Sequence, residues 1–291
     1  MILVTGATGH YGRATIDFLL QKGISPGFIA GLARDESKGA ELTSRGVQLK
    51  IGDYNDYNSL VEACKGVNKL LLVSGTDIIN RSRQHENVVK AAKETGVKHI
   101  LYTSFERKNE TESSPLGMLA KSHLYTERII KETGLPYTIL RNNFYLDYLP
   151  LFLGEKVLET GVFFPAGEGK MAMASRSDMA EAAANILIGN AHENKEYYIS
   201  NSENFSFQDV ADILSSVSGK TVPYINPDIP TYIDTLVKAG VPREIVDASV
   251  GYAEAIKQGE LASSKSDLET LLGRKPASVR EYLAGVYGSK L

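Results

Sequence analysis

The sequence predicts an α/β protein with a doubly wound parallel sheet of the Rossmann type and a small, mainly helical C-terminal domain. Three observations lead to this prediction: an apolar strand and a glycine turn open the chain, strands and helices then alternate steadily to about residue 145, and the alternation fades beyond. Such alternation is typical of parallel sheets with helices on both faces. We expect a dinucleotide-binding domain over residues 1–150, to which residues 170–200 return, and a small domain formed by residues 151–169 and 201–291.

The glycine turn is the segment Gly6–Gly12, which lies between the apolar residues 2–4 and a predicted helix over residues 14–20. Its glycines allow a sharp turn and a close approach to a ligand, and the first amides of the helix carry partial positive charge. A phosphate or pyrophosphate fits such a site. The spacing G-x-x-G-x-x-G differs from the G-x-G-x-x-G of many dehydrogenases. The assignment of a phosphate site therefore depends on the position of the motif between the first strand and a helix.

The second strand is predicted over residues 28–33 and ends at Arg34-Asp35. In this architecture the end of strand two lies beside the adenosine ribose. A cation there binds the 2′-phosphate of NADP, whereas a carboxylate binds the ribose hydroxyls of NAD. Arg34 lies 22 residues beyond Gly12, close to the usual spacing of about 20. The position favours NADP(H), and Asp35 beside it keeps the NAD alternative open.

Three further strands supply the middle of the predicted sheet, over residues 47–51, 69–73 and 97–102, with helices over residues 36–46, 57–65 and 82–95. Asp53, after the third strand, is placed to approach the adenine amino group, and Asp56 is expected to cap the next helix. Ser74-Gly75 ends the fourth strand with small residues that leave room for ribose and pyrophosphate. Ser104 follows the fifth strand, near the expected nicotinamide, because ligands lie beyond the carboxyl ends of such strands.

The regular part ends with a polar loop over residues 106–116, a helix over residues 121–132 and a sixth strand over residues 136–140. Beyond it we expect a helix over residues 178–188, a strand at residues 197–199 that returns to the main sheet, and a helix over residues 207–218. Three prolines then mark the entry to C-terminal helices, predicted near residues 231–239, 243–257 and 266–272.

Composition argues against several classes of function. The net charge is −3 without a basic run, which argues against nucleic-acid binding. No apolar run approaches the roughly 18 residues of a membrane span, and because the first strand is predicted to begin at residue 2 we expect no signal peptide. Cys64 is the single cysteine, expected to be a buried inert thiol, and fits a reducing cytoplasm. The five scattered histidines give no metal spacing. We expect a cytoplasmic monomer or homodimer without a metal.

Four features together carry a resemblance to a known family: G-A-T-G-x-x-G at the N-terminus, Arg34 after strand two, Tyr102-Thr103-Ser104 after strand five, and Tyr137–Asn142. With them the chain resembles the NmrA-like branch of the atypical short-chain dehydrogenase/reductases, strongly over residues 1–145 and more loosely beyond. The resemblance implies an NADPH-dependent oxidoreductase that passes hydride directly to a quinone or similar conjugated acceptor, with the small C-terminal domain covering the substrate. The alternative that it implies is a regulatory protein that senses NADP(H) without catalysis.

Taken together with the strand ends, the resemblance predicts a cofactor site in which the glycine loop holds the pyrophosphate and the segment after strand six flanks the nicotinamide as a wall. One residue of the small domain is expected to reach the site as well. The predicted cofactor-binding residues are Gly6, Thr8, Gly9, His10, Tyr11, Gly12, Arg34, Asp53, Ser74, Gly75, Thr103, Arg141, Asn142, Asn143, Phe144, Tyr145 and Lys170.

The proton relay of ordinary short-chain dehydrogenases is missing from this sequence. Those enzymes use Tyr-x-x-x-Lys, in which the lysine lowers the pKa of the tyrosine that passes the proton. None of the fifteen tyrosines has a lysine four residues later, and Tyr125 on the expected helix is followed by Ile129. A quinone does not need a strong acid, because hydride addition gives a resonance-stabilised anion that water can protonate. The protein then has only to align the two rings.

Ser104, Lys121 and His123 are the candidate catalytic residues. Lys121 and His123 are expected just before or at the start of the helix that carries the dyad in relatives, and their structural alternatives are a solvated lysine and a histidine of the helix N-terminus. Ser104 is expected to hydrogen-bond the nicotinamide or the substrate, unless it is a plain turn residue. Glu127 and Lys131, four residues apart, are expected to form an ion pair on the helix surface.

Overall fold

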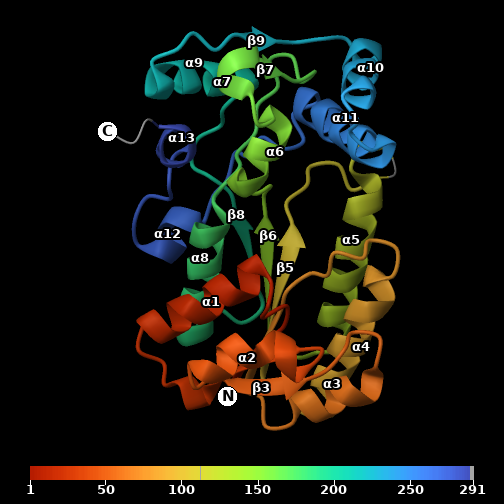
Figure 1. Cartoon of the computed structure of the whole chain (residues 1–291). Coiled ribbons are helices and arrows are strands. Elements are labelled where there is room, and N and C mark those ends of the chain that lie inside the picture. Colours follow the sequence, from red (N-terminus) through yellow and green to blue (C-terminus); the bar gives the residue numbers. More distant parts are fainter. Residues whose placement is uncertain (112, 289–291) are drawn as a thin grey trace.

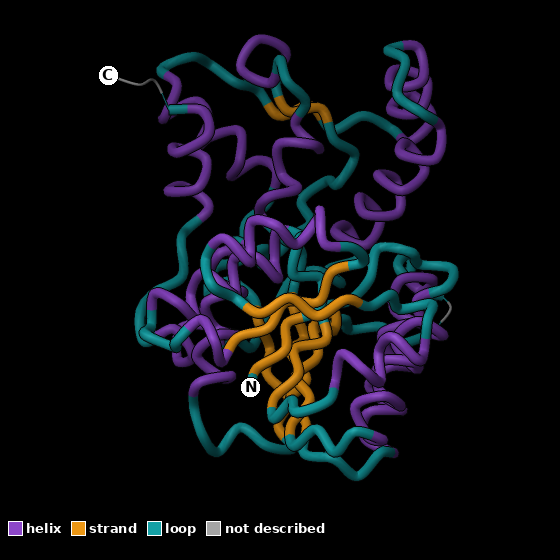
Figure 2. Tube along the Cα trace, turned by 60° about the horizontal axis from the view of Figure 1, so that its bottom comes forward, coloured by secondary structure: helices purple, strands orange, loops and turns teal. Residues whose placement is uncertain are grey.

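The computed structural model describes residues 1–111 and 113–288. Its centre is a seven-stranded sheet in the order β3-β2-β1-β4-β5-β6-β8, in which every neighbouring pair is parallel. Helices flank the strands on both sides (Figure 1, Figure 2). The predicted fold class is therefore confirmed. The strands are β1 (Ile2–Val4), β2 (Ile29–Ala33), β3 (Gln48–Ile51), β4 (Lys69–Leu72), β5 (His99–Phe105), β6 (Tyr137–Asn142) and β8 (Lys195–Ile199).

Two apolar cores lie on opposite faces of this sheet. In β4, Leu71 packs into the core that includes α1, whereas Leu70 and Leu72 pack into the other core, because successive side chains of a strand point to opposite faces. Helix α1 packs on α8, and α4 packs on both α3 and α5. The helices of this part are α1 (His10–Gln21), α2 (Glu36–Ser44), α3 (Tyr57–Cys64), α4 (Arg81–Glu94), α5 (Gly117–Glu132) and α8 (Arg176–Ile188).

The smaller part of the chain lies beyond the ends of β5 and β6 (Figure 1). It has an apolar core of its own, built around Phe164 and Phe207, whose ring centroids lie 4.4 Å apart. Its strands form a separate two-stranded parallel sheet. The remaining elements are η1 (Pro26–Phe28), η2 (Leu146–Tyr148), α6 (Leu149–Leu153), α7 (Val157–Thr160), β7 (Val162–Phe163), α9 (Phe207–Ser218), β9 (Tyr224–Ile225), α10 (Ile229–Lys238), α11 (Arg243–Lys257), α12 (Leu268–Leu272) and α13 (Val279–Tyr287).

Three predicted boundaries near the site are wrong, and the parallel ladder explains two of them. Strand β5 continues to Phe105 and β6 continues to Asn142, since each gives the other backbone hydrogen bonds: Ser104 pairs with Arg141, and Phe105 with Asn142. Helix α5 begins at Gly117 rather than near residue 121. Helix α13 was not predicted. The return of β8 to the main sheet beside β6 is confirmed, as is the cap of α3 by Asp56.

No helix among the described residues has the length and apolar character that crossing a bilayer requires. Cys64 is buried, as predicted, and burial raises the pKa of its thiol to about 11. Among the same residues, no group of three or more His, Cys, Asp or Glu side chains is arranged to hold a metal ion.

Candidate functional site

A cavity of about 580 Å³ opens at the carboxyl ends of β1, β2, β3 and β4. Strand β1 is the point where the connections of the sheet reverse, since β2 pairs on one side of it and β4 on the other. Ligands of open α/β sheets bind at this point. The lining residues are Gly6, Thr8, Gly9, His10, Tyr11, Gly12, Leu32, Ala33, Arg34, Lys38, Gly52, Asp53, Tyr54, Asn55, Val73, Ser74, Gly75, Thr76, Asp77, Gln84, Tyr145, Tyr148 and Arg176.

The glycine loop is shaped as a cradle for a ligand. Gly6 has a φ of +57°, a region that favours glycine. The Gly9 amide donates to the Gly6 carbonyl at 2.9 Å, and α1 begins at the next residue, so that its first amides have no carbonyl one turn earlier. A Cβ on Gly12 would lie 2.4 Å from the Gly6 carbonyl oxygen. The loop therefore keeps its shape only with glycine at this position, and it offers free amides to an anion.

Tyr11 is a structural residue as well as a lining residue. Its buried hydroxyl donates to the carbonyl of Met179 at 3.0 Å, which attaches α1 to α8. Burial raises the pKa of this phenol far above its ordinary value. The side chain therefore holds the loop in place from behind, and its ring lies 6.3 Å from that of Tyr145 on the cavity wall.

Arg34 and Asp35 differ in what surrounds them. Arg34 is exposed and lines the cavity, together with Lys38 from the first turns of α2. Asp35 is the N-cap of α2: it accepts from the Ser37 hydroxyl at 2.6 Å and from the Lys38 amide at 2.9 Å, which together lower the pKa of this carboxyl. The carboxylate is thus used by the cap of α2 and by Lys38, whose Nζ lies 3.6 Å from it, and the two cations line the cavity beside the position expected for the ribose.

The end of β4 is held by a buried hydrogen-bond chain. The amide of Ser74 donates to Thr103 Oγ1 at 2.8 Å, and the amide of Gly75 donates to His85 Nε2 at 3.0 Å. The other ring nitrogen of His85 lies 2.9 Å from Thr126 Oγ1. Burial lowers the pKa of His85 to about 3, so the ring is neutral and accepts the Gly75 amide. Thr103 therefore supports the cavity wall from behind.

The three candidate catalytic residues lie outside the cavity lining. His123 is buried in α5, 2.8 Å from the Tyr102 hydroxyl and 3.2 Å from Arg81 Nη1, and burial holds its pKa well below the ordinary value. Lys121 is exposed and lies in the second turn of α5, because the helix begins earlier than predicted. Ser104 is buried within β5, where its hydroxyl donates to Glu127. Their catalytic roles remain untested predictions.

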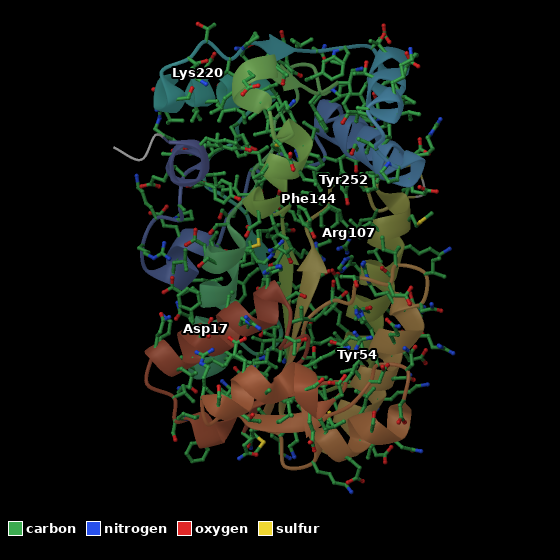
Figure 3. The ribbon with its side chains drawn as sticks, viewed as in Figure 1. Asp17, Tyr54, Arg107, Phe144, Lys220 and Tyr252 are labelled. Atoms are coloured by element: carbon green, nitrogen blue, oxygen red, sulfur yellow. The ribbon has the colours of Figure 1, made fainter. Side chains whose placement is uncertain are left out.

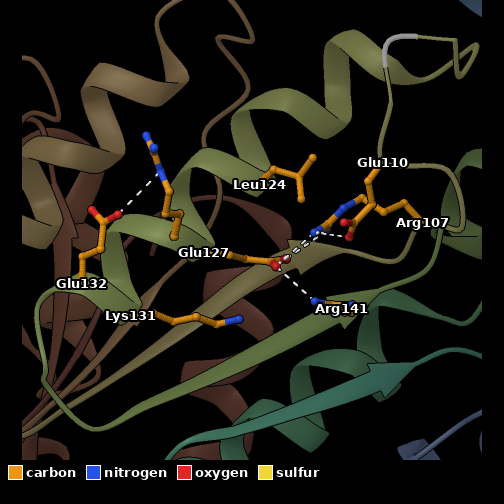
Figure 4. A pocket seen from close by; sticks show the side chains of 8 residues that line it. Arg107, Glu110, Leu124, Glu127, Lys131, Glu132 and Arg141 are labelled. Atoms are coloured by element: carbon orange, nitrogen blue, oxygen red, sulfur yellow. Dashed lines mark hydrogen bonds and ion pairs between the residues drawn. The ribbon is translucent and has the colours of Figure 1, made fainter.

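Glu127 is the centre of a buried ion cluster behind β5 and β6 (Figure 4). Arg107 donates to both of its carboxylate oxygens, at 2.9 and 3.0 Å, and Arg141 donates at 3.3 Å. Burial by itself raises the pKa of Glu127, but the hydrogen bonds and charge of Arg107 outweigh it, and the pKa lies below its ordinary value. The predicted surface pair is wrong: Lys131 pairs with Glu196 instead, at 2.6 Å.

The segment after β6 reaches the cavity through one of its predicted residues, Tyr145. Asn143 is buried and donates to Glu106 Oε2 at 2.9 Å and to the carbonyl of Leu261 at 3.2 Å. Phe144 packs against Tyr252 with the rings tilted and their centroids 4.5 Å apart, in the region between the two parts of the molecule (Figure 3). This segment therefore ties the sheet to the small domain, and Tyr145 alone of residues 141–145 stands at the wall.

Two other predicted positions are also absent from the lining. Asn142 is buried at the end of β6, and Arg141 pairs with Glu127 and with Glu196, the latter at 2.8 Å. Lys170 is exposed, in the loop that follows β7. Binding of a cofactor by these residues remains a prediction.

Sequence reasoning missed Arg176, which lines the cavity from the start of α8. Its guanidinium lies 4.8 Å from the ring centroid of Tyr145 and 5.5 Å from that of Tyr148, and 3.6 Å from Asp147. The chain carries no local motif around this arginine. Its role follows only from the packing of α8 beside α1, which no pattern within residues 170–180 indicates.

Comparisons with known proteins agree with this geometry. Residues 1–283 match the model of the NmrA-like family. Quinone oxidoreductase 2 of Escherichia coli is 34% identical over 288 residues, with 99% of each chain covered. A crystal structure of Citrobacter sp. triphenylmethane reductase with NADP(H) has a TM-score of 0.91 at 37% identity, covering 98% of this chain and 99% of that one. The Escherichia coli quinone oxidoreductase with NADPH has a TM-score of 0.90 at 33% identity, covering 99% and 100%.

Proposed function

The chain belongs to the NmrA-like family, and from this premise we propose that it is an NADPH-dependent oxidoreductase that passes hydride directly to a quinone or a similar conjugated acceptor. Two similar solved structures are described as complexes with NADP(H) and NADPH, and one curated relative is a quinone oxidoreductase. The likeness spans nearly the whole of each chain, so the proposal concerns the whole protein and not the sheet alone.

The observation that carries the proposal is the pair of cations that line the cavity, Arg34 and Lys38. The neighbouring carboxylate, Asp35, caps α2 and lies 3.6 Å from Lys38 Nζ. A 2′-phosphate beside the two cations would gain charge-assisted hydrogen bonds, whereas Asp35, which would have to accept from the ribose hydroxyls of NAD, already accepts from the helix cap. The free amides of the Gly6–Gly12 loop would hold the pyrophosphate, and glycine at position 12 lets the loop close against the Gly6 carbonyl.

A bound reduced nicotinamide would supply the hydride. The chain itself would align the acceptor and keep it against the ring, since Tyr145 and Tyr148 stack at 6.0 Å and line the cavity. Tyr125 donates to Glu86 at 2.8 Å, and no lysine follows it at the dyad spacing. We propose that residues 1–150 with 170–200 bind the dinucleotide, and that residues 151–169 and 201–291 cover the acceptor.

Cofactor choice tests the proposal directly. Replacing Arg34 by alanine should weaken NADPH binding by roughly tenfold to a hundredfold and change NADH binding little, because a charge-assisted contact to the 2′-phosphate is worth about 1.5–3 kcal/mol. Calorimetry of both dinucleotides measures the effect. Arg13→Ala is the matched control, since Arg13 is an exposed arginine that pairs with Glu41 at 2.7 Å and does not line the cavity. Equal weakening of both dinucleotides refutes the assignment.

Turnover separates the reductase from a protein that senses NADP(H). The purified chain is mixed with NADPH and a panel of quinones, and the absorbance at 340 nm is followed. The proposal expects oxidation of NADPH that depends on the quinone. Tight binding of NADPH without oxidation across the panel favours the sensing alternative, for which the absence of the Tyr-x-x-x-Lys pair is the motivating observation.

A further inference from the structure

Arg81 places a positive charge in the interior, and none of the described residues puts a carboxylate within hydrogen-bond distance of it. The residue opens α4 and is 5% exposed. Its Nε donates to the Gly75 carbonyl at 2.7 Å, and its Nη1 lies 3.3 Å from Ser122 Oγ and 3.2 Å from His123 Nε2. The hydrogen-bond partners of Arg81 within the described part of the chain are thus a carbonyl, a hydroxyl and a neutral imidazole, and none of them carries a negative charge. Buried charges are ordinarily paired, so this arrangement is unusual.

The wider surroundings of Arg81 do not neutralise it either. Asp77 is the carboxylate among the groups that act on it electrostatically, and this side chain is exposed and already bonded to Asn80 at 2.8 Å and to Gln84 at 3.3 Å. The other titratable groups around Arg81 are histidines and tyrosines that stay neutral at neutral pH. They are His85 on α4, Tyr102 on β5, His123 on α5, Tyr145 after β6 and Tyr252 on α11.

This charge lies directly behind the wall of the cavity. Gly75 lines the cavity, and its carbonyl is the group to which Arg81 donates. Tyr145, which also lines the cavity, is within electrostatic range of the guanidinium. Buried charges act over several ångströms, because little water screens them. The Arg81 guanidinium therefore adds a positive charge behind the part of the wall formed by Gly75 and Tyr145, while the exposed carboxylate of Asp77 lines the same cavity at the surface.

We propose that Arg81 makes the site selective for neutral acceptors that become anionic when they accept hydride, such as quinones, over acceptors that are already cationic, such as triphenylmethane dyes. The inference rests on the proposed reductase function and names the class of acceptor within it. It also assigns the role of a specificity residue to a side chain that touches the cavity wall and not the acceptor.

The charge balance of the two reactions explains the selectivity. Hydride carries two electrons, and its transfer oxidises the reduced dinucleotide. A neutral quinone becomes a hydroquinone monoanion, which then takes one proton from water. A cationic triphenylmethane dye gains a C–H bond at its central carbon and becomes neutral. A buried cation stabilises the developing anion in the first reaction, whereas in the second it repels the substrate before any bond forms.

The test compares two acceptors in one protein. Menadione is the neutral quinone, crystal violet is the cationic dye, and kcat/KM is measured for each with NADPH. Arg81→Met should lower kcat/KM for menadione about tenfold and raise it for crystal violet several-fold, since a unit charge acts with opposite sign on the two reactions. A purely structural role would lower both together.

Controls and a binding measurement accompany the kinetics. Lys90→Met removes a positive charge from the exposed face of the same helix, where Lys90 pairs with Glu86 at 2.7 Å, and should leave the ratio unchanged. Arg81→Lys keeps the charge and should keep most of the preference. Titration of crystal violet into the protein loaded with NADP⁺, where no hydride transfer occurs, should show tighter binding to Arg81→Met than to the wild type.

An unchanged ratio of the two kcat/KM values, or a parallel fall of both, overturns the role of Arg81 and leaves the reductase proposal standing. If Arg81→Met does not fold, Arg81→Gln, which retains a donor for the Gly75 carbonyl, takes its place under the same criteria. Wild-type protein that oxidises NADPH with neither acceptor nor any quinone refutes the reductase proposal itself, and the inference about Arg81 falls with it.

Discussion

Two buried arginines contact the same helix, α5, in opposite electrostatic settings. Arg107 has a side chain that is 1% exposed and is bonded through both terminal nitrogens to Glu127, with Glu110 3.1 Å away. Arg81 is equally hidden, yet its partners are uncharged. The first lies behind β5 and β6, in a hollow separate from the cavity, and the second lies against the cavity wall. A neutralised pair fits a structural role, whereas a charge without a counter-ion acts on what binds nearby.

Breaking the Arg107 pair should have the largest effect on stability. Glu127→Gln leaves Arg107 and Arg141 buried without their common carboxylate, and removal of one partner from a buried pair costs about 3–5 kcal/mol. Urea unfolding measures the loss. Glu132→Ala is the matched control on the same helix, because its pair with Arg128 is 3.9 Å long and exposed, so the expected loss is below about 0.5 kcal/mol. Equal losses for the two variants would show that Glu127 is not the centre of the cluster.

The surroundings of Arg81 and those of Arg107 should lose stability over different ranges of acid pH. His85 is neutral in the folded protein down to a pKa of about 3, because burial disfavours its charged form, while an unfolded histidine takes a proton near its ordinary value of 6.5. Between pH 6.5 and about 3 the unfolded state therefore binds more protons than the folded state. The stability that the neutral His85 contributes above pH 6.5 is lost progressively as the pH falls through this range. Each such histidine contributes about 1.4 kcal/mol per pH unit. Glu127, whose pKa is lowered, loses its contribution only below its ordinary value of 4.5.

His85→Gln checks this separation. Unfolding free energies measured in urea between pH 6.5 and 4.5 should fall less steeply for the variant than for the wild type, and the two curves should differ by about 1.4 kcal/mol per pH unit. Glutamine retains an acceptor for the Gly75 amide, so the comparison removes the titration and keeps the contact. Parallel curves would contradict a neutral His85 beside Arg81.

Removing Arg81 should have the smallest effect on stability. Arg81→Met leaves the Gly75 carbonyl and His123 Nε2 without their donor, at about 1–3 kcal/mol for an unsatisfied group, but it also relieves the burial of an unpaired charge. These opposing changes lead us to expect a net loss below about 2 kcal/mol by urea unfolding. A loss as large as that of Glu127→Gln would show that Arg81 has a structural role like that of Arg107.

The sequence predicted best the part of the cavity formed by the glycine loop and by the residues that follow β2, β3 and β4. The glycine loop and Arg34 each follow directly on a strand, so a short stretch of sequence carries both the turn and its position at the carboxyl edge of the sheet. The cavity lining includes every predicted residue of the loop, together with Arg34, Asp53, Ser74 and Gly75. Their function in binding is what the Arg34→Ala experiment tests.

The residues predicted beside the nicotinamide show where sequence reasoning ends. Ser104 and Arg141 lie in β5 and β6, beyond the apolar residues from which these strands were predicted. Both strands continue to this point because their backbones hydrogen-bond to each other. Glu127 and Lys131 are four residues apart, a spacing that predicts an ion pair on the helix surface. Glu127 is instead paired with Arg107, which follows β5. Spacing along one helix describes which residues share a face of it, and it does not describe what packs against that face.

By itself, then, the sequence determined the fold class, the family, the glycine loop and the cation after strand two, since each of these depends on local strand–turn–helix patterns and on their repetition along the first 145 residues. Only the tertiary structure decided which charges are paired. Arg81 is separated by 41 residues from Ser122 and by 42 from His123, and Arg107 by 20 from Glu127. Such partners meet because parallel strands bring the ends of distant segments to one edge of the sheet. Burial then strengthens the electrostatic interaction of each charge, whether that charge is paired or not.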